Sequence, residues 1–225
     1  MKPIESIATY VFFDLGTTGL DIIDSVITEI HIIAIRCEDL PKYFEESTAG
    51  CFAGPPADER LHCRLVNDVM CFISQNCNYY EPCNLSEEAC RFLDQLERPL
   101  ALIAHNGIKF DFPLLKYSLA KVDGYSPNDF ACADSIAAFY DILEPDSKKT
   151  SYIQRSRGAF PWPDNYYDKK MSYRLRDVYK IVRGAKPVLD DARDRNIALM
   201  ETALDLEFVF MRWVAENNMP LSCIQ

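Results

Sequence analysis

Two aspartates and the turns beside them are the residues of this chain best placed for chemistry. Asp14 ends the apolar run Val11–Phe13, and Asp111 follows the apolar run 100–104 after a His-Asn-Gly turn. Short apolar runs of this kind predict buried strands. A carboxylate at the tip of a buried strand is unfavourable unless it is paired, hydrogen-bonded or bound to a metal. Asp14 and Asp111 are therefore candidate metal ligands, and an ordinary turn or helix cap is the alternative for each.

The next expected strand contains two more titratable side chains. Residues 16–19 turn the chain, and the apolar run 26–35 follows them. Glu29 and His31 lie on the same side of that run, because side chains alternate along a strand. We interpret them as a polar edge or a satisfied pair rather than as catalytic groups.

The rest of the pattern alternates strands and helices, as in an α/β domain. Further strands are expected at 63–72, 100–104 and 131–135, and helices at 86–97, from 110 onward, at 136–143, at 172–182 and at 190–217. Residues 37–60 are expected to form a loop. We predict one domain over residues 1–225, with a mixed central sheet of about five strands and helices on both faces.

Residues 144–171 form a long excursion from this alternation. The segment contains three prolines together with a cluster of aromatic and basic side chains: Trp162, Tyr166, Tyr167, Lys169 and Lys170. Such a cluster could stack on single-stranded bases, bind a protein or cover the cleft. We prefer the protein-facing interpretation because the chain as a whole is acidic.

Composition limits the classes of partner. The chain has 225 residues, 48% of them hydrophobic, and a formal net charge of −10. Binding of nucleic acid over a broad surface depends on Lys and Arg, so this charge argues against it but leaves a narrow cleft possible. No apolar run approaches the roughly 20 residues of a membrane span, and the N-terminus lacks a signal-peptide pattern. An intracellular protein of the cytoplasm or nucleus, without membrane contact, is expected.

The nine cysteines do not form a recognisable metal site. Five of them lie at positions 63–90 without a Cys-x-x-Cys pair. Structural zinc sites usually contain such closely spaced pairs. We therefore interpret these cysteines as reduced thiols, partly buried as small hydrophobic residues.

Two segments resemble motifs of the DEDDh 3′→5′ exonucleases. Asp14 with the sequence Thr-Thr-Gly-Leu at 17–20 resembles the first motif, Asp-x-Glu-Thr-Thr-Gly-Leu, except that Gly16 stands where the motif has Glu. Residues 104–115 resemble the second motif, in which an Asp follows a strand-end His-Asn and opens a helix. The order and spacing of the segments resemble the three-prime repair (TREX-type) branch of this family.

This resemblance implies a ribonuclease-H-like (DnaQ-like) exonuclease fold and two-metal hydrolysis of phosphodiesters. In that chemistry, four carboxylates hold two Mg²⁺ or Mn²⁺ ions, and a His at the start of the last helix acts as general base. The third motif reads His, four residues, Asp. In this chain Asp190 takes the place of that His, and Arg195 takes the place of the Asp. Asp194 is the alternative ligand if the helix slips by one residue, although one residue rotates a side chain by about 100°.

Two of the five family positions therefore match, Asp14 and Asp111, and three are replaced: Gly16, Asp190 and Arg195. Gly16 removes a ligand, and Arg195 places a fixed cation where a metal should bind and could pair with both aspartates. A solvated carboxylate at 190 is a much weaker base than imidazole near neutral pH. We predict a catalytically inactive pseudo-enzyme that binds nucleic acid or protein and holds no cofactor tightly.

The alternative is an active, metal-dependent 3′→5′ exonuclease on single-stranded DNA or RNA. It would use Mg²⁺ or Mn²⁺ in a rearranged site built from Asp14, Asp111 and Asp190, with Asp194 as a further ligand. A protein-binding adaptor whose cleft is closed by Arg195 is a third hypothesis.

The resemblance also indicates residues and partners for binding. It implies that Thr18, Gly19 and Leu20 contact a terminal nucleotide, with a simple turn as the alternative, and that His105 and Asn106 belong to the same interface. The expected partners are weakly bound single-stranded nucleic acid, a protein and a second copy of the chain, since the family branch forms homodimers.

Overall fold

The computed structural model describes residues 7–19, 21–45, 61–66, 69–75, 85–123, 130–144 and 172–224. For residues 45, 61–66, 69–75, 85 and 86 only the backbone is described. Of the excursion predicted at 144–171, residues 145–171, with the aromatic and basic cluster, lie outside the described residues, as does Leu20. Among the described residues, no helix combines the length and the apolar character that a bilayer crossing requires.

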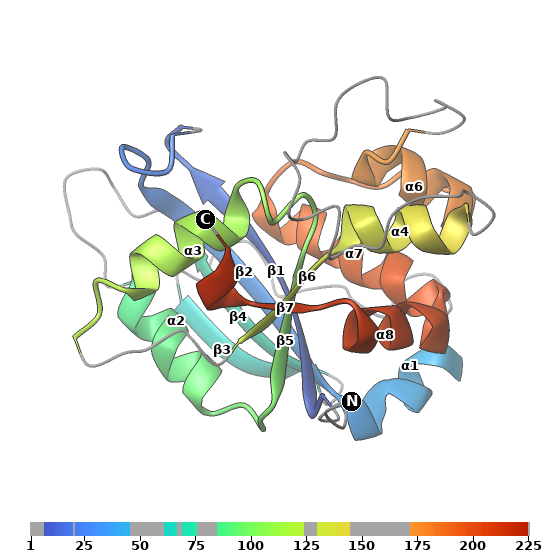
Figure 1. Cartoon of the computed structure of the whole chain (residues 1–225), viewed down its shortest axis with the longest axis horizontal. Helices are drawn as coiled ribbons and strands as arrows, with labels where there is room; N and C mark the ends of the chain where they lie inside the picture. Colours follow the sequence, from blue (N-terminus) through green and yellow to red (C-terminus); the bar gives the residue numbers. More distant parts are fainter. Residues whose placement is uncertain are drawn as a thin grey trace.

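The centre of the fold is a mixed sheet with the strand order β3-β4-β2-β1-β5-β6-β7 (Figure 1). Strand β1 (Thr9–Thr17) pairs antiparallel with β2 (Ile27–Arg36) and parallel with β5 (Leu100–Ala104). Beyond β5, β6 (Ala131–Asp134) is parallel and β7 (Met219–Pro220) antiparallel. Strand β1 therefore lies between an antiparallel and a parallel neighbour, which makes the sheet mixed as predicted.

Two segments differ from the sequence prediction. The single strand expected at 63–72 was wrong, because this stretch contains two antiparallel strands, β3 (Leu61–Val66) and β4 (Val69–Gln75). With this extra strand and the short β7, the described sheet has seven strands rather than about five. The expected loop at 37–60 begins with a 3₁₀ turn (Cys37–Asp39) and α1 (Leu40–Glu45). Pro41 is compatible with α1 because it lies in the first turn.

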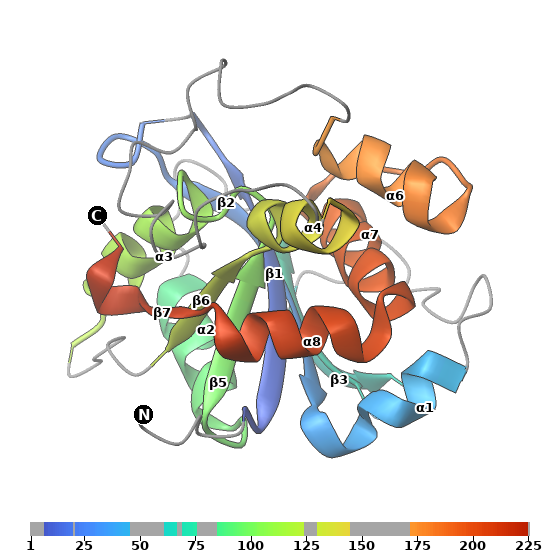
Figure 2. The same ribbon diagram turned by 45° about the vertical axis from the view of Figure 1, so that its right-hand side comes forward.

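Helices cover both faces of the sheet (Figures 1 and 2). On one face lie α2 (Leu85–Asp94) and α3 (Asp111–Leu119), and on the other lie α1, α4 (Ser135–Leu143), α7 (Ala192–Asp205) and α8 (Glu207–Glu216). Helix α6 (Leu175–Arg183) packs against α7. The helix expected at 190–217 is two helices, since the chain bends at Leu206 and Glu207 has a positive φ of 49°.

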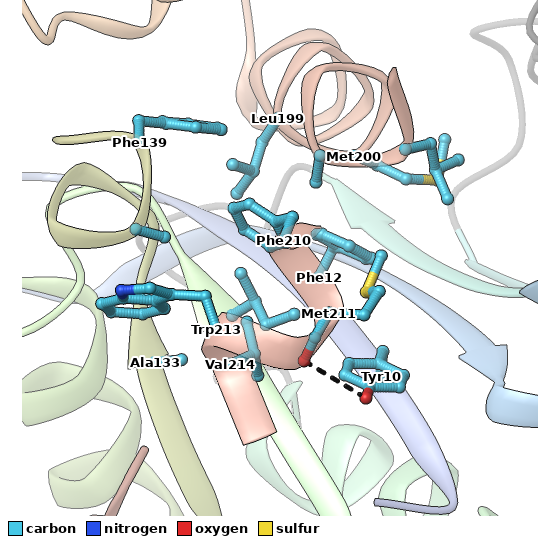
Figure 3. Close-up of a cluster of buried hydrophobic side chains, with 14 of the residues drawn as sticks. Tyr10, Phe12, Ala133, Phe139, Leu199, Met200, Phe210, Met211, Trp213 and Val214 are labelled. Carbon is cyan, nitrogen blue, oxygen red and sulfur yellow. Dashed lines mark hydrogen bonds between the residues drawn. The ribbon is translucent and has the colours of Figure 1, made fainter. Parts of the chain in front are cut away.

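Alternating side chains of β1 supply the two halves of the core. Tyr10 and Phe12 pack toward α7 and α8, whereas Val11, Phe13 and Leu15 pack toward α2 and α3. In Figure 3 Phe12 lies among Met200, Phe210 and Met211, and the Tyr10 hydroxyl donates to the Met211 carbonyl. Burial on both faces explains why the run at 11–13 is continuously apolar. It also fixes β1 between two helix layers, so that the end of this strand is held rigidly.

Candidate functional site

The end of β1 holds the first candidate residue, Asp14, against a cation from α7. The Arg195 Nε donates to Asp14 Oδ1 at 2.9 Å, and one terminal nitrogen of the guanidinium donates to the same oxygen. The same terminal nitrogen also donates to the Leu15 carbonyl at 3.2 Å. Helix α7 packs across β1 and β2, and this packing brings the guanidinium to the strand end. The charge of Asp14 is therefore satisfied by a side chain of the protein itself.

Burial dominates the electrostatics of Asp14. It raises the pKa of Asp14 from 3.8 to about 6, an effect that the Arg195 hydrogen bond and charge oppose. The nearby carboxylates of Glu29 and Asp191 raise the same pKa further. The Asp14 side chain is 14% exposed and that of Arg195 33%, so water still reaches the pair. Asp14 is consequently a partly buried acid that needs its cation near neutral pH.

Asp111 is the first residue of α3 and is nearly buried, with 7% of its surface exposed. Burial raises its pKa well above 3.8, and the charges of Asp14 and Asp134 act in the same direction. The charge of Arg195 lowers it. The described hydrogen bonds of Arg195 go to Asp14 and Leu15, so the sequence-based expectation of pairing with both aspartates holds as a hydrogen bond for Asp14 only.

The residues expected to replace the third motif occupy different positions at the start of α7. Asp190 is exposed and precedes the helix. Asp191 is the N-cap, and its Oδ1 accepts from the Asp194 backbone N–H at 2.8 Å. The side chain that reaches Asp14 is that of Arg195, one position after Asp194. The structure thus follows the ungapped alignment of this motif rather than the alternative with a slipped helix.

Gly16 and Glu29 are paired across β1 and β2. A Cβ at position 16 would lie 2.9 Å from the Glu29 Cβ and 3.0 Å from its Oε2, which is too close for two side chains. The Glu29 Oε2 accepts from the Ala192 backbone N–H at 3.1 Å, at the N-terminus of α7. The sequence-based interpretation of Glu29 as a polar edge or a satisfied pair did not foresee this contact, because only the strand register brings the carboxylate opposite Gly16.

The turn after β1 is closed by its own hydrogen bonds. The Thr18 N–H donates to the Val26 carbonyl, and the Val26 N–H donates to Thr18 Oγ1, both at 3.0 Å. Thr18 and Gly19 are exposed, and Leu20 lies outside the described residues. The geometry therefore accounts for Thr18 as a turn residue, and nucleotide contact by these residues stays a prediction.

A carboxylate that sequence reasoning did not single out organises the turn between β5 and α3. The buried Asp134 accepts from the backbone N–H groups of Asn106 and Ile108, both at 3.1 Å, and of Ile136 at 3.0 Å. Burial raises its pKa to about 6, although these hydrogen bonds oppose the rise. Asp134 thereby fixes the turn containing His105 and Asn106, which leads into Asp111. Its position directly before a helix was the available sequence signal, because aspartate is a common N-cap.

Under the cleft, Asn196 joins α7 to the two central strands. Its Nδ2 donates to the Phe12 carbonyl at 3.0 Å, and it lies 3.0 Å from His31 Nδ1 and 3.1 Å from the His31 carbonyl. Asn196 is fully buried and His31 is 2% exposed. The prediction of His31 as a satisfied polar residue rather than a catalytic one agrees with this geometry. The contact also fixes the rotation of α7, and with it the direction of Arg195.

The His31 imidazole is expected to remain neutral at pH 5. Burial, helped by the charge of Arg193, lowers its pKa from 6.5 to about 3. The unfolded state therefore binds the extra proton between those values, and this group makes the protein more stable as pH rises across that window. Nitrogen-15 NMR should show an imidazole protonated at Nε2 alone, and urea-unfolded protein should show the ordinary titration. A folded-state midpoint above pH 6 would contradict this prediction.

The donor set does not fit a pair of divalent ions in its present arrangement. Such ions require converging oxygen ligands, and here a guanidinium lies against the Asp14 carboxylate. Among the described residues, no three His, Cys, Asp or Glu side chains are placed to hold a metal ion. What the cleft holds instead is an ion pair within the chain.

Comparisons with known proteins identify relatives by sequence. No family model matches the chain. It is 29% identical to three prime repair exonuclease 2 of Mus musculus over 63% of this chain, and the match spans 65% of that protein, less than two thirds of its length. It is 25% identical to three-prime repair exonuclease 1 of Bos taurus, over 99% of this chain and 71% of that protein.

Solved structures share the fold. E. coli exonuclease I in complex with a dA16 oligonucleotide superposes with a TM-score of 0.52 at 13% identity, covering 92% of this chain and 42% of that chain. Exonuclease I in its apo form gives 0.51 at 14% identity, with 92% and 44% covered. Identity this low supports the fold alone, and it agrees with the predicted ribonuclease-H-like architecture. The chain is thus similar in sequence to the three-prime repair exonucleases and similar in fold to exonuclease I.

Proposed function

We propose that this exonuclease-like domain is catalytically inactive and acts as a binding module for nucleic acid or protein. The observation that carries the proposal is the Arg195 guanidinium on Asp14, with the Nε 2.9 Å from Oδ1. A guanidinium is a permanent cation that cannot release a proton to generate hydroxide at neutral pH. It also cannot take up an attacking water as an open metal coordination position does. The guanidinium therefore neutralises Asp14 as a metal ion would, but it cannot activate a water molecule.

The other two replaced positions support the same conclusion. Gly16 offers no ligand, and the exposed Asp190 precedes α7 and lacks the properties of an imidazole base. The third motif thus provides neither the base nor the carboxylate that two-metal hydrolysis uses. Loss at three separate positions argues for lapsed catalysis more strongly than loss at one.

We also propose the setting in which the domain acts. Exonuclease I among the structural relatives was solved with an oligonucleotide, so weak contact of this chain with single-stranded nucleic acid through residues 18–20, His105 and Asn106 is part of the proposal. A protein partner and a homodimer complete it, in an intracellular location of the cytoplasm or nucleus. The net charge of −10 favours a protein partner over tight binding of nucleic acid.

The purified chain is expected not to shorten end-labelled single-stranded DNA or RNA in the presence of Mg²⁺ or Mn²⁺. Substrate and product would be separated on denaturing gels over a time course, with Asp14→Ala as the matched control for contaminating nuclease. Shortening from the 3′ end that Asp14→Ala abolishes would contradict the proposal and favour the active alternative, with Mg²⁺ or Mn²⁺ as its cofactor. A salt-dependent mobility shift without cleavage would favour nucleic-acid binding over a purely protein-binding role.

A further inference from the structure

Glu29 fills the space that Gly16 leaves open. The two residues are paired across β1 and β2, and any side chain at 16 would meet Glu29 at its Cβ and its carboxylate. Gly16 has no described φ that only glycine adopts, since the one positive-φ glycine among the described residues is Gly184. The reason for glycine at 16 is therefore the room it provides, not backbone conformation. The side chain that needs this room is Glu29.

The carboxylate of Glu29 interacts electrostatically with the ion pair of Asp14 and Arg195. Burial lowers the pKa of Arg195, but the hydrogen bond to Asp14 and the charges of Asp14, Glu29 and Asp111 raise it and thus favour the charged form. Besides burial, which is the larger cause in both, the charge of Glu29 raises the pKa of Asp14, and the charge of Asp14 raises the pKa of Asp111. Glu29 from β2 thus lies against Gly16, next to the strand end where the guanidinium from α7 binds Asp14 and the Leu15 carbonyl. The bond from the Ala192 N–H orients Glu29 toward this centre.

We propose that Glu29 supplies, from β2, the carboxylate that the chain lacks at position 16, and that Arg195, bound to Asp14, is the cation that balances these acidic side chains. This inference rests on the proposed function, because it explains how the cleft stays closed to divalent ions. It differs from a simple loss of ligands, because a carboxylate from the neighbouring strand takes the space beside Gly16.

The acidic side chains near Arg195 need a positive charge, so removing the guanidinium should change what they bind. Without the guanidinium, the partly buried carboxylates of Asp14, Glu29 and Asp111 must take up protons or another cation. Oxygen-only donors of this kind suit Mg²⁺ and Mn²⁺. The side chains would have to turn toward one another, since the wild-type arrangement among the described residues does not hold a metal. Arg195→Ala should therefore convert an ion pair into a weak divalent-cation site.

The test measures Mn²⁺ binding to the full chain by calorimetry and by the shift in Tm, without an activity readout. Wild type and Arg176→Ala, which removes an exposed arginine on α6, are expected not to respond. Arg195→Ala should bind one ion saturably and gain Tm, and Glu29→Gln in that background should weaken binding by about tenfold or more. Absence of binding by Arg195→Ala, or binding that Glu29→Gln leaves unchanged, would overturn this inference. Mn²⁺ binding by wild type would instead overturn the proposed function.

A second measurement does not depend on the stability of the arginine variant. Gly16→Ala should lower Tm by several degrees in the wild-type chain, because its methyl group meets Glu29. The same substitution should cost much less in a Glu29→Gly background, where the space is free. An equal loss of Tm in the two backgrounds would show that Gly16 and Glu29 act independently and would overturn this inference.

Discussion

Replacing Arg195 by leucine is expected to lower the free energy of unfolding by about 2–3 kcal/mol at pH 7, because it leaves the Asp14 carboxylate partly buried without its partner. The loss should be smaller than the roughly 3–5 kcal/mol typical of a fully buried pair. Water screens the interaction, since the Arg195 side chain is 33% exposed. Urea denaturation followed by circular dichroism would measure it, with the exposed Arg176→Leu on α6 as the matched control.

The pH dependence of this loss distinguishes a charge effect from a packing effect. The pKa of Asp14 is raised to about 6 in the folded protein, against 3.8 for the ordinary group. The folded state therefore binds more protons in that window, and the contribution of Asp14 to stability decreases as pH rises through it. Without Arg195 this pKa should rise further, so the variant should lose most stability above pH 7 and little at pH 5. An equal loss at both pH values would contradict the electrostatic explanation.

Replacing Asp134 by alanine is expected to have a larger effect, about 3–5 kcal/mol. Three backbone N–H groups, those of Asn106, Ile108 and Ile136, would lose their acceptor in a buried place. A lost helix cap costs about 0.5–2 kcal/mol, and each further unsatisfied buried group about 1–3 kcal/mol. Thermal and urea denaturation would measure the effect.

Two comparisons make the Asp134 prediction specific. Asp123→Ala, at an exposed position after α3, should change stability little and serves as the control. Asp134→Asn should be intermediate, because the amide oxygen accepts hydrogen bonds while its NH₂ group faces donors. If Asp134→Ala is as mild as Asp123→Ala, the carboxylate does not organise the turn that leads into Asp111.

Much of the site could be predicted from the sequence, because chain geometry left few alternatives. Asp14 follows a continuously apolar strand that had to be central, and Arg195 lies three residues after Ala192 in a helix with an apolar face. The apolar run after Arg195 fixed the alignment of α7, so the prediction that the arginine replaces the last motif residue required no insertion. The observed contact between Arg195 and Asp14 agrees with that alignment.

What the sequence could not provide depends on pairing between distant segments. The role of Glu29 follows from its register opposite Gly16, and a shift of one residue would have turned its side chain to the other face. Asp134 accepts hydrogen bonds from a turn 26 to 28 residues earlier in the chain. The parallel pairing of β5 and β6 brings the two segments together. The stretch at 63–72 contains two strands, and the polar Asn67 and Asp68 that separate them in the sequence are the turn signal that the prediction of a single strand overlooked.

A cation that belongs to the polypeptide differs from a dissolved one in its dependence on concentration. The guanidinium of Arg195 is tethered beside Asp14 by helix α7, so its local concentration is set by geometry and not by the surrounding medium. Chelators and dialysis cannot remove it, and changes in free magnesium cannot dilute it. At a given pH, the cation beside Asp14 should therefore stay in place whatever the concentration of free divalent ions in the surrounding medium.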